Sequence, residues 1–332
     1  MALFLTENDV KQVLTVAMAL EAVESAHRDL ALGQAQDTPR ARTRLPQTVL
    51  HILQGALPAQ GVLGYKAYTS NRSANRFLVH LFDAATGGLL AVIEADYMGM
   101  IRTGAASGVA AKWLARPDAK VAGVFGAGWQ AEGHVRAICA ALPLERVKVC
   151  SRRADKLAVF CGRMSEATGV TVVPVASAEA AVRGSDLVGT VTTAAQPLFD
   201  ADWLEPGTHI NAAGSNALIR QELSEAAVRR CSVLTVDAVP TALAEAGDLF
   251  PTLIAFNDWV NHDLKSILQS RFDLPVAVFA RGILTSIAEE KFGAAKGLKD
   301  FICLDLCNGV GMSFYVNGSV VRGANQVAGQ IG

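Results

Sequence analysis

The segment formed by residues 121–131 limits the possible folds of this chain more than any other stretch. It opens with a short apolar run, residues 121–125, which is typical of a buried parallel strand. Gly126-Ala-Gly128 follows directly, and an alanine-rich helical pattern continues over residues 130–141. The first glycine permits a tight turn, and the second lets the backbone approach a pyrophosphate at the helix N-terminus. This order predicts a dinucleotide-binding unit, although a glycine-rich turn without a ligand is the plainer alternative.

The rest of the second half repeats the strand–helix rhythm. Further strands are expected at 147–150, 171–175, 187–192, 208–213 and 233–237, and helices at 154–167, 177–183, 253–269 and 276–291. Strands that alternate with helices predict an α/β fold with a doubly wound parallel sheet of the Rossmann type.

The first hundred residues have a different pattern. A short strand at residues 3–5, an N-cap at Thr6 and two helical stretches up to Leu32 come first. Strand-like segments then predict an antiparallel sheet, at 43–53, 62–69, 77–82 and 89–94. A helix of small residues over 103–115 is expected to pack closely against a neighbour. Arg116-Pro-Asp118 breaks that helix, so we place a domain boundary there, with residues 1–117 before it and residues 118–301 after it.

Composition excludes several classes of protein. The formal net charge is −1, which gives no footprint for nucleic acid. No apolar run is long enough to span a membrane, and the N-terminal residues do not resemble a signal peptide. The 6 cysteines are scattered without a Cys-x-x-Cys pair, and the 6 histidines show no metal spacing. We therefore expect a cytoplasmic protein with reduced cysteines and no bound metal.

The end of the second predicted strand bears on the choice of cofactor. An acid at this position commonly binds the ribose 2′-hydroxyl of NAD. Here residues 146–150 run into Ser151-Arg152-Arg153, with no acid. A hydroxyl and two guanidinium groups suit a 2′-phosphate. NADP(H) is therefore the predicted cofactor and NAD(H) the alternative, and a solvated helix start capped by Ser151 is the reading without a ligand.

Six segments together resemble the ornithine cyclodeaminase/mu-crystallin family. They are Arg42–Pro46, Gly64–Tyr68, Ile101–Ala106, Gly126–Ala131, His209–Asn216 and Glu245–Asp248. The resemblance implies a Rossmann domain inserted in an α+β domain that binds substrate and forms a homodimer, with residues 302–332 returning to that first domain. The expected cofactor-binding residues are Gly126, Ala127, Gly128, Trp129, Gln130, Ser151, Arg152, Thr192, Ala213, Gly214 and Ser215.

In that family, two arginines and a lysine hold the substrate α-carboxylate. By motif, these roles fall on Arg42, Lys66 and Arg102. Two or three cations can fix a small amino or imino acid beside the nicotinamide. The plainer readings are an edge-strand guard for Arg42, a surface lysine for Lys66 and an exposed arginine for Arg102.

Asn216 is a departure from the cyclodeaminase pattern. Cyclodeaminases carry an Asp there, and an amide cannot exchange protons as an acid does. A late lysine of the family is also replaced, within Cys307–Gly311. We therefore favour NAD(P)H-dependent reduction of an α-imino acid, with Lys66, Arg102 and Asn216 as catalytic candidates. The alternatives are an ammonia lyase with recycled NAD and a crystallin-like NADPH-binding protein without turnover.

Additional cations bear on the charge of the substrate. Arg40, Arg42 and Arg44 alternate, so on a strand they share one face. Together with Arg72, they exceed what one carboxylate needs. Arg44 and Arg72 therefore join the predicted substrate-binding residues, and a dicarboxylate such as iminosuccinate, which gives aspartate, is the sharper hypothesis. Surface arginines around a dimer edge are the alternative.

Overall fold

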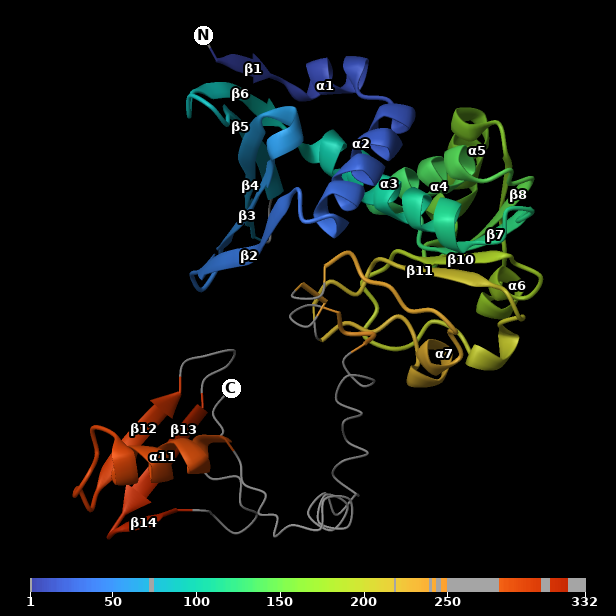
Figure 1. The fold of residues 1–332 in the computed structure, drawn as a ribbon. Helices are drawn as coiled ribbons and strands as arrows, with labels where there is room; N and C mark the ends of the chain where they lie inside the picture. The colour runs from blue at the N-terminus through green and yellow to red at the C-terminus, as the bar shows by residue number, and fades with distance from the viewer. Residues whose placement is uncertain are drawn as a thin grey trace. The chain divides into compact units, whose positions relative to one another are not determined.

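The computed structural model describes residues 2–71, 75–217, 219–238, 241–242, 246–249, 281–305 and 311–321. The chain divides into two compact units, residues 1–254 and 255–332, and each is described by itself (Figure 1). The predicted helix at 253–269, Arg72 and Cys307 lie outside the described residues.

A six-stranded sheet forms the first part of unit 1. Its strands are β1 (Leu3–Leu5), β2 (Gln36–Arg44), β3 (Val49–Leu57), β4 (Val62–Ser70), β5 (Asn75–Asp83) and β6 (Leu89–Glu94), in the order β1-β6-β5-β4-β3-β2. Neighbouring strands from β2 to β6 are antiparallel, and β1 is parallel to β6. The single strand predicted over 43–53 is wrong, because a turn closed by the Leu45 N–H on the Thr48 carbonyl divides it. A 3₁₀ turn, η1 (Pro58–Gln60), joins β3 to β4.

Three helices lie on one side of this sheet: α1 (Glu7–Val13), α2 (Val16–Ala31) and α3 (Asp96–Leu114) (Figure 1). The N-cap predicted at Thr6 is present, with a capping box to Asp9. Helix α3 begins seven residues earlier than expected. Its small residues pack inside the chain against α4, where a Cβ added to Gly104 would lie 2.1 Å from the Gly133 carbonyl oxygen. Its small residues on the α4 side are therefore buried within the chain itself.

The second part of unit 1 is the predicted doubly wound parallel sheet. Its strands are β7 (Val121–Phe125), β8 (Arg146–Cys150), β9 (Thr171–Pro174), β10 (Leu187–Thr190) and β11 (His209–Ala212), in the order β11-β10-β7-β8-β9. Helices α4 (Trp129–Ala141) and α5 (Ala154–Thr168) pack on one face, and α6 (Ala178–Val182), α7 (Glu225–Arg229) and η2 (Ala201–Trp203) on the other.

The central strands carry a fully apolar core, with Val124, Val147 and Leu187 at most 1% exposed. The strand predicted at 233–237 is wrong. Val233 and Leu234 are 66% and 56% exposed, so this apolar run does not join the sheet.

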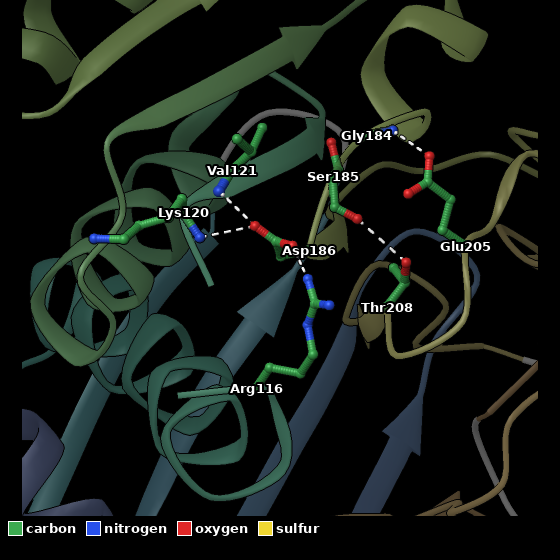
Figure 2. A network of polar contacts seen from close by, with 8 residues as sticks. All are labelled: Arg116, Lys120, Val121, Gly184, Ser185, Asp186, Glu205 and Thr208. Carbon is green, nitrogen blue, oxygen red and sulfur yellow. Dashed lines mark hydrogen bonds and ion pairs between the residues drawn. The ribbon is translucent and has the colours of Figure 1, made fainter. Parts of the chain in front are cut away.

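A carboxylate fixes the entry into the parallel sheet at the expected boundary (Figure 2). Asp186 accepts the N–H groups of Lys120 and Val121 at 2.8 and 2.9 Å and pairs with Arg116, just after α3 ends. Partial burial alone raises the pKa of this carboxyl, but the two N–H donors and the guanidinium lower it below its usual value. One ionised side chain therefore fixes the start of β7 to the end of α3.

Unit 2 contains α11 (Arg281–Phe292) and the antiparallel strands β12 (Phe301–Asp305), β13 (Gly311–Val316) and β14 (Ser319–Val320). Ser286 and Ser313 share a buried hydrogen bond between helix and sheet. The helix predicted over 276–291 is present from residue 281 to 292 in the described part. The predicted domain boundaries, and the return of residues 302–332 to the first domain, stay predictions. No helix in the described part of the chain has the length and apolarity needed to cross a bilayer.

Candidate active site

Unit 1 contains one large cleft of about 2650 Å³. Its wall includes one face of the six-stranded sheet, α3 from Arg102 to Leu114, and the carboxyl ends of the parallel strands. Open α/β sheets bind ligands at those carboxyl ends. The cleft therefore brings the cation-rich first part of the chain to the predicted cofactor turn.

Aromatic rings line the sheet face of the cleft around Lys66. His51, Tyr68 and Phe77 lie opposite one another on β3, β4 and β5, and their rings stack at centroid distances of 4.3 and 4.6 Å. Lys66 Nζ lies 5.5 Å from the Tyr68 centroid and 5.8 Å from that of Phe77. The rings attract the ammonium group of Lys66 through cation–π contacts, and they do not neutralise its charge.

Lys66 and Arg102 form the electrostatic centre of the cleft. Loss of hydration, followed by the charges of Arg102 and Arg40, lowers the pKa of Lys66 to about 7. Arg102, from α3, is exposed to the cleft but surrounded by protein atoms. This surrounding, and then Arg40, lower its pKa, against the opposing influence of Asp237. Within the described residues, neither side chain has an ion pair. Two unneutralised cations side by side favour binding of an anion.

The arginines of β2 line the same cleft. Arg40, Arg42 and Arg44 are all part of its wall. Arg42 lies opposite His51, and Arg40 donates to the Tyr68 hydroxyl at 2.9 Å from a bulge between Thr38 and Ala41. Positive charge therefore extends from Lys66 to the edge of the sheet.

The glycine turn after β7 has the shape that a dinucleotide needs. Gly126 has φ +116°, and a Cβ there would lie 2.6 Å from the Val191 carbonyl oxygen. Gly128 is the N-cap of α4, with no side chain capping the helix and open space where a Cβ would be. The first N–H groups of α4 are thus available to an anion. Ala127, Trp129 and Gln130 line the cleft beside the turn, so the predicted cofactor cradle fits a pyrophosphate.

The end of β8 also opens into the cleft. Ser151, Arg152 and Arg153 all line it, and both arginines are exposed. The Ser151 hydroxyl accepts the Arg153 N–H at 3.2 Å, in a turn just before α5. The expected N-cap at Ser151 is wrong, because α5 (Ala154–Thr168) has Arg153 as its N-cap and no side-chain cap, whereas two cations are present at the end of the strand as expected.

A buried acid that sequence reasoning missed supports the loops after β10 and β11. Glu222 has no exposed surface, and it accepts the N–H groups of Thr192 at 2.6 Å and Gly214 at 2.8 Å. Burial raises the pKa of Glu222, and hydrogen bonds from Thr192 oppose that rise. Asp248 in turn accepts the Glu222 and Leu223 N–H groups. The only sequence signal was the position of Asp248 in a family motif.

Asn216 lies exposed at the cleft, directly after this supported loop. Its side-chain oxygen accepts a hydrogen bond from Arg220 at 2.6 Å. The Ser215 hydroxyl donates to the Arg220 carbonyl at 2.6 Å, which fixes the same loop. The amide group of Asn216 can orient a ligand, but it cannot act as an acid or base.

Comparisons with known proteins agree with this arrangement. Residues 1–262 match the ornithine cyclodeaminase/mu-crystallin family. The chain belongs to this family. Residues 232–332 also match the ROK family.

Three relatives illustrate the likeness. A Δ1-pyrroline-2-carboxylate reductase from Bacillus cereus is 39% identical over 172 residues, covering 52% of this chain and 53% of that protein. The structure of Thermococcus litoralis Δ1-pyrroline-2-carboxylate reductase with NADH and L-proline has a TM-score of 0.72 at 30% identity, covering 76% and 81% of the two chains. An archaeal alanine dehydrogenase dimer with bound NAD has a TM-score of 0.71 at 31% identity, covering 76% and 79%. The chain spans about half the length of the curated reductases that it matches.

Proposed function

We propose that the chain is an NAD(P)H-dependent reductase that converts a small α-imino acid to the amino acid. The observation that carries this proposal is a pair of cations, Lys66 and Arg102. They have no ion-pair partner within the described residues and line the same cleft as the Gly126–Gly128 turn. Relatives named as imino-acid reductases and amino-acid dehydrogenases support it.

The residues have separate tasks in this reaction. Lys66 and Arg102 bind the α-carboxylate and hold the imine carbon at one place in the cleft. When bound, the dihydronicotinamide supplies a hydride to that carbon. A protonated imine already carries the proton that the amine product needs, so no side-chain acid is required. Asn216 then needs only to orient the nitrogen.

The deciding assay follows NAD(P)H absorbance with pyruvate, glyoxylate or oxaloacetate plus ammonium or methylamine. Net oxidation of NAD(P)H supports a reductase. Ammonia release from a diamino acid without net absorbance change supports the cyclodeaminase-type lyase. Cofactor binding with neither reaction supports a crystallin-like binding protein.

Arg152 is proposed to select NADP(H). Arg152→Ala is expected to raise the KM for NADPH about tenfold or more and to leave that for NADH unchanged, because one charge-assisted contact to the 2′-phosphate is lost. Steady-state kinetics with both cofactors measure this. Arg163→Ala, on α5 and paired with Glu132, is the matched control. A wild-type preference for NADH would refute this assignment.

The arginines of β2 favour a dicarboxylate as a narrower substrate class. Iminosuccinate, formed from oxaloacetate and ammonia, is then expected to exceed the pyruvate imine in kcat/KM by about ten- to hundredfold, because one more charged pair forms. Arg44→Ala is expected to remove most of this preference and spare the pyruvate imine. Equal kcat/KM values for the two imines would show that these arginines do not bind a second carboxylate of the substrate.

A homodimer is proposed through the outer face of the six-stranded sheet. Leu50, Leu63 and Leu89 remain 37%, 41% and 40% exposed, and Tyr65 stacks on His80 beside them. Such a face favours a twofold partner. Light scattering at micromolar concentration is expected to give a dimer, and Leu63→Glu to shift it toward monomer. A monomeric wild type would contradict the proposal.

A further inference from the structure

His134 is a buried polar group that the proposed reaction does not use. It lies on α4 at 4% exposure, and its Nε2 is fully covered without a hydrogen-bond partner among the residues that the structure describes. Nearly all buried side-chain nitrogens have such a partner, so this one calls for an explanation.

The packing of α4 on α3 places His134 at the contact between the two helices, on the wall of the cleft. A Cβ added to Gly104 would lie 2.7 Å from the His134 backbone nitrogen, so the two helices touch at this residue. Besides burial, the charge of Arg102, also on α3, is close enough to the imidazole to lower the pKa of His134. Arg102 and His134 both line the cleft.

The charge state of His134 suits a hydrogen-bond acceptor. Burial, followed by the charge of Arg102, lowers the pKa of His134 to about 4. The imidazole is therefore neutral near pH 7, and one of its ring nitrogens carries a lone pair that accepts a hydrogen bond.

We propose that His134 is a positioning residue for Arg102: its Nε2 accepts a hydrogen bond from the guanidinium when a carboxylate occupies the cleft. A guanidinium has five N–H donors and a carboxylate accepts two, so donors remain for the imidazole. Because Nε2 is covered, its partner has to come from the wall of the cleft rather than from a ligand. The inference rests on the proposed function.

A neutral acceptor has a physical advantage over an acidic one at this place. An Asp or Glu beside Arg102 would form an ion pair and cancel the charge that attracts the substrate. An imidazole restricts the rotation of the guanidinium and leaves its full charge for the substrate carboxylate. Removal of His134 should therefore weaken substrate binding and leave the cofactor site unchanged.

The test uses the full chain with His134→Leu and His134→Met, which lack the acceptor, and His134→Gln, whose carbonyl restores one. The first two are expected to raise the KM for the imino acid about ten- to hundredfold and to leave the cofactor Kd within about twofold. His134→Gln is expected to recover most of the loss. In an Arg102→Lys background, His134→Leu should add little, because the two residues act as one unit. Cys139→Ala, on the same helix but outside the cleft, is the matched control.

The outcomes separate this inference from the function on which it rests. Calorimetric titration of pyruvate into the cofactor-saturated protein reports α-carboxylate binding without turnover. Wild-type protein that binds no pyruvate would refute the proposed function and this inference with it. Equal pyruvate binding by wild type and His134→Leu, additive effects with Arg102→Lys, or a loss confined to cofactor affinity would overturn the inference alone.

Discussion

Lys66→Met and Arg102→Met are each expected to lower kcat/KM for the imino acid by about ten- to hundredfold. Each change removes one of the two charged hydrogen-bond donors that we propose for the substrate α-carboxylate in the cleft. The KM for the cofactor should barely change. Steady-state kinetics with the imino acid and the cofactor varied in turn measure both effects.

The pH dependence of the same reaction tests Lys66 by a second route. The pKa of Lys66 is about 7, lowered first by burial and then by Arg102 and Arg40. The protonated amine binds the carboxylate, so kcat/KM should be level below about pH 7 and should fall above it as the free enzyme loses this proton. A bound carboxylate favours the charged form, so the corresponding fall in kcat should lie at higher pH. Lys66→Arg should remove the fall near pH 7.

Lys148→Met is the matched control for Lys66. Lys148 is also a lysine whose pKa burial lowers, but its Nζ donates to the Arg183 carbonyl at 2.6 Å, outside the cleft. Its replacement should leave kcat/KM unchanged. Trapping of substrate on Lys66 by borohydride would show a Schiff base and refute the carboxylate-binding role.

Local patterns predicted the parallel sheet well, because each strand, turn and helix there is signalled within about ten residues. Gly126 and Gly128 mark a turn whose backbone geometry excludes a larger residue at the first position. The strand predicted at 233–237 is absent because a local pattern alone does not decide whether a strand joins a sheet. The short run Val233-Leu-Thr-Val236 is rich in β-branched residues and resembles a strand, but whether it pairs depends on tertiary contacts that a short window does not contain.

The first sheet was predicted less accurately for reasons of chain geometry. Pro39 lies within the bulge of β2, and a proline usually argues against a strand, so the beginning of β2 was missed. Edge strands tolerate proline because the N–H groups on their outer side form no hydrogen bonds with another strand, and β2 is an edge strand. The hairpin turn at residues 45–48 was missed for lack of a glycine signal.

In the candidate site too, some residues could be predicted from the sequence and others could not. Charged residues that face a ligand, such as Lys66 and Arg102, stand out by type and motif. Residues that support the site through buried contacts do not, because their partners are far apart in sequence. Thr192 and Glu222 are 30 residues apart, and their hydrogen bond follows only from the fold.

Replacement of the buried Glu222 is expected to cause a large loss of stability. Glu222→Ala is expected to lower the free energy of unfolding by about 3 kcal/mol or more, because the N–H groups of Thr192 and Gly214 lose a fully buried acceptor. Urea denaturation with an unchanged m-value measures this. Any folded fraction should also bind the cofactor less tightly, since the loops after β10 and β11 lose their common anchor.

Glu205 provides the contrast that separates a buried acceptor from an exposed one. It accepts the Gly184 N–H at 3.1 Å, as Glu222 accepts its donors, but it is exposed (Figure 2). Water can replace it, so Glu205→Ala should cost under about 1 kcal/mol. Glu222→Gln keeps one carbonyl oxygen but turns an NH₂ group toward the second N–H, and its cost should fall between the two. Equal losses for Glu205→Ala and Glu222→Ala would mean that the Glu222 carboxylate does not hold the two cofactor loops together.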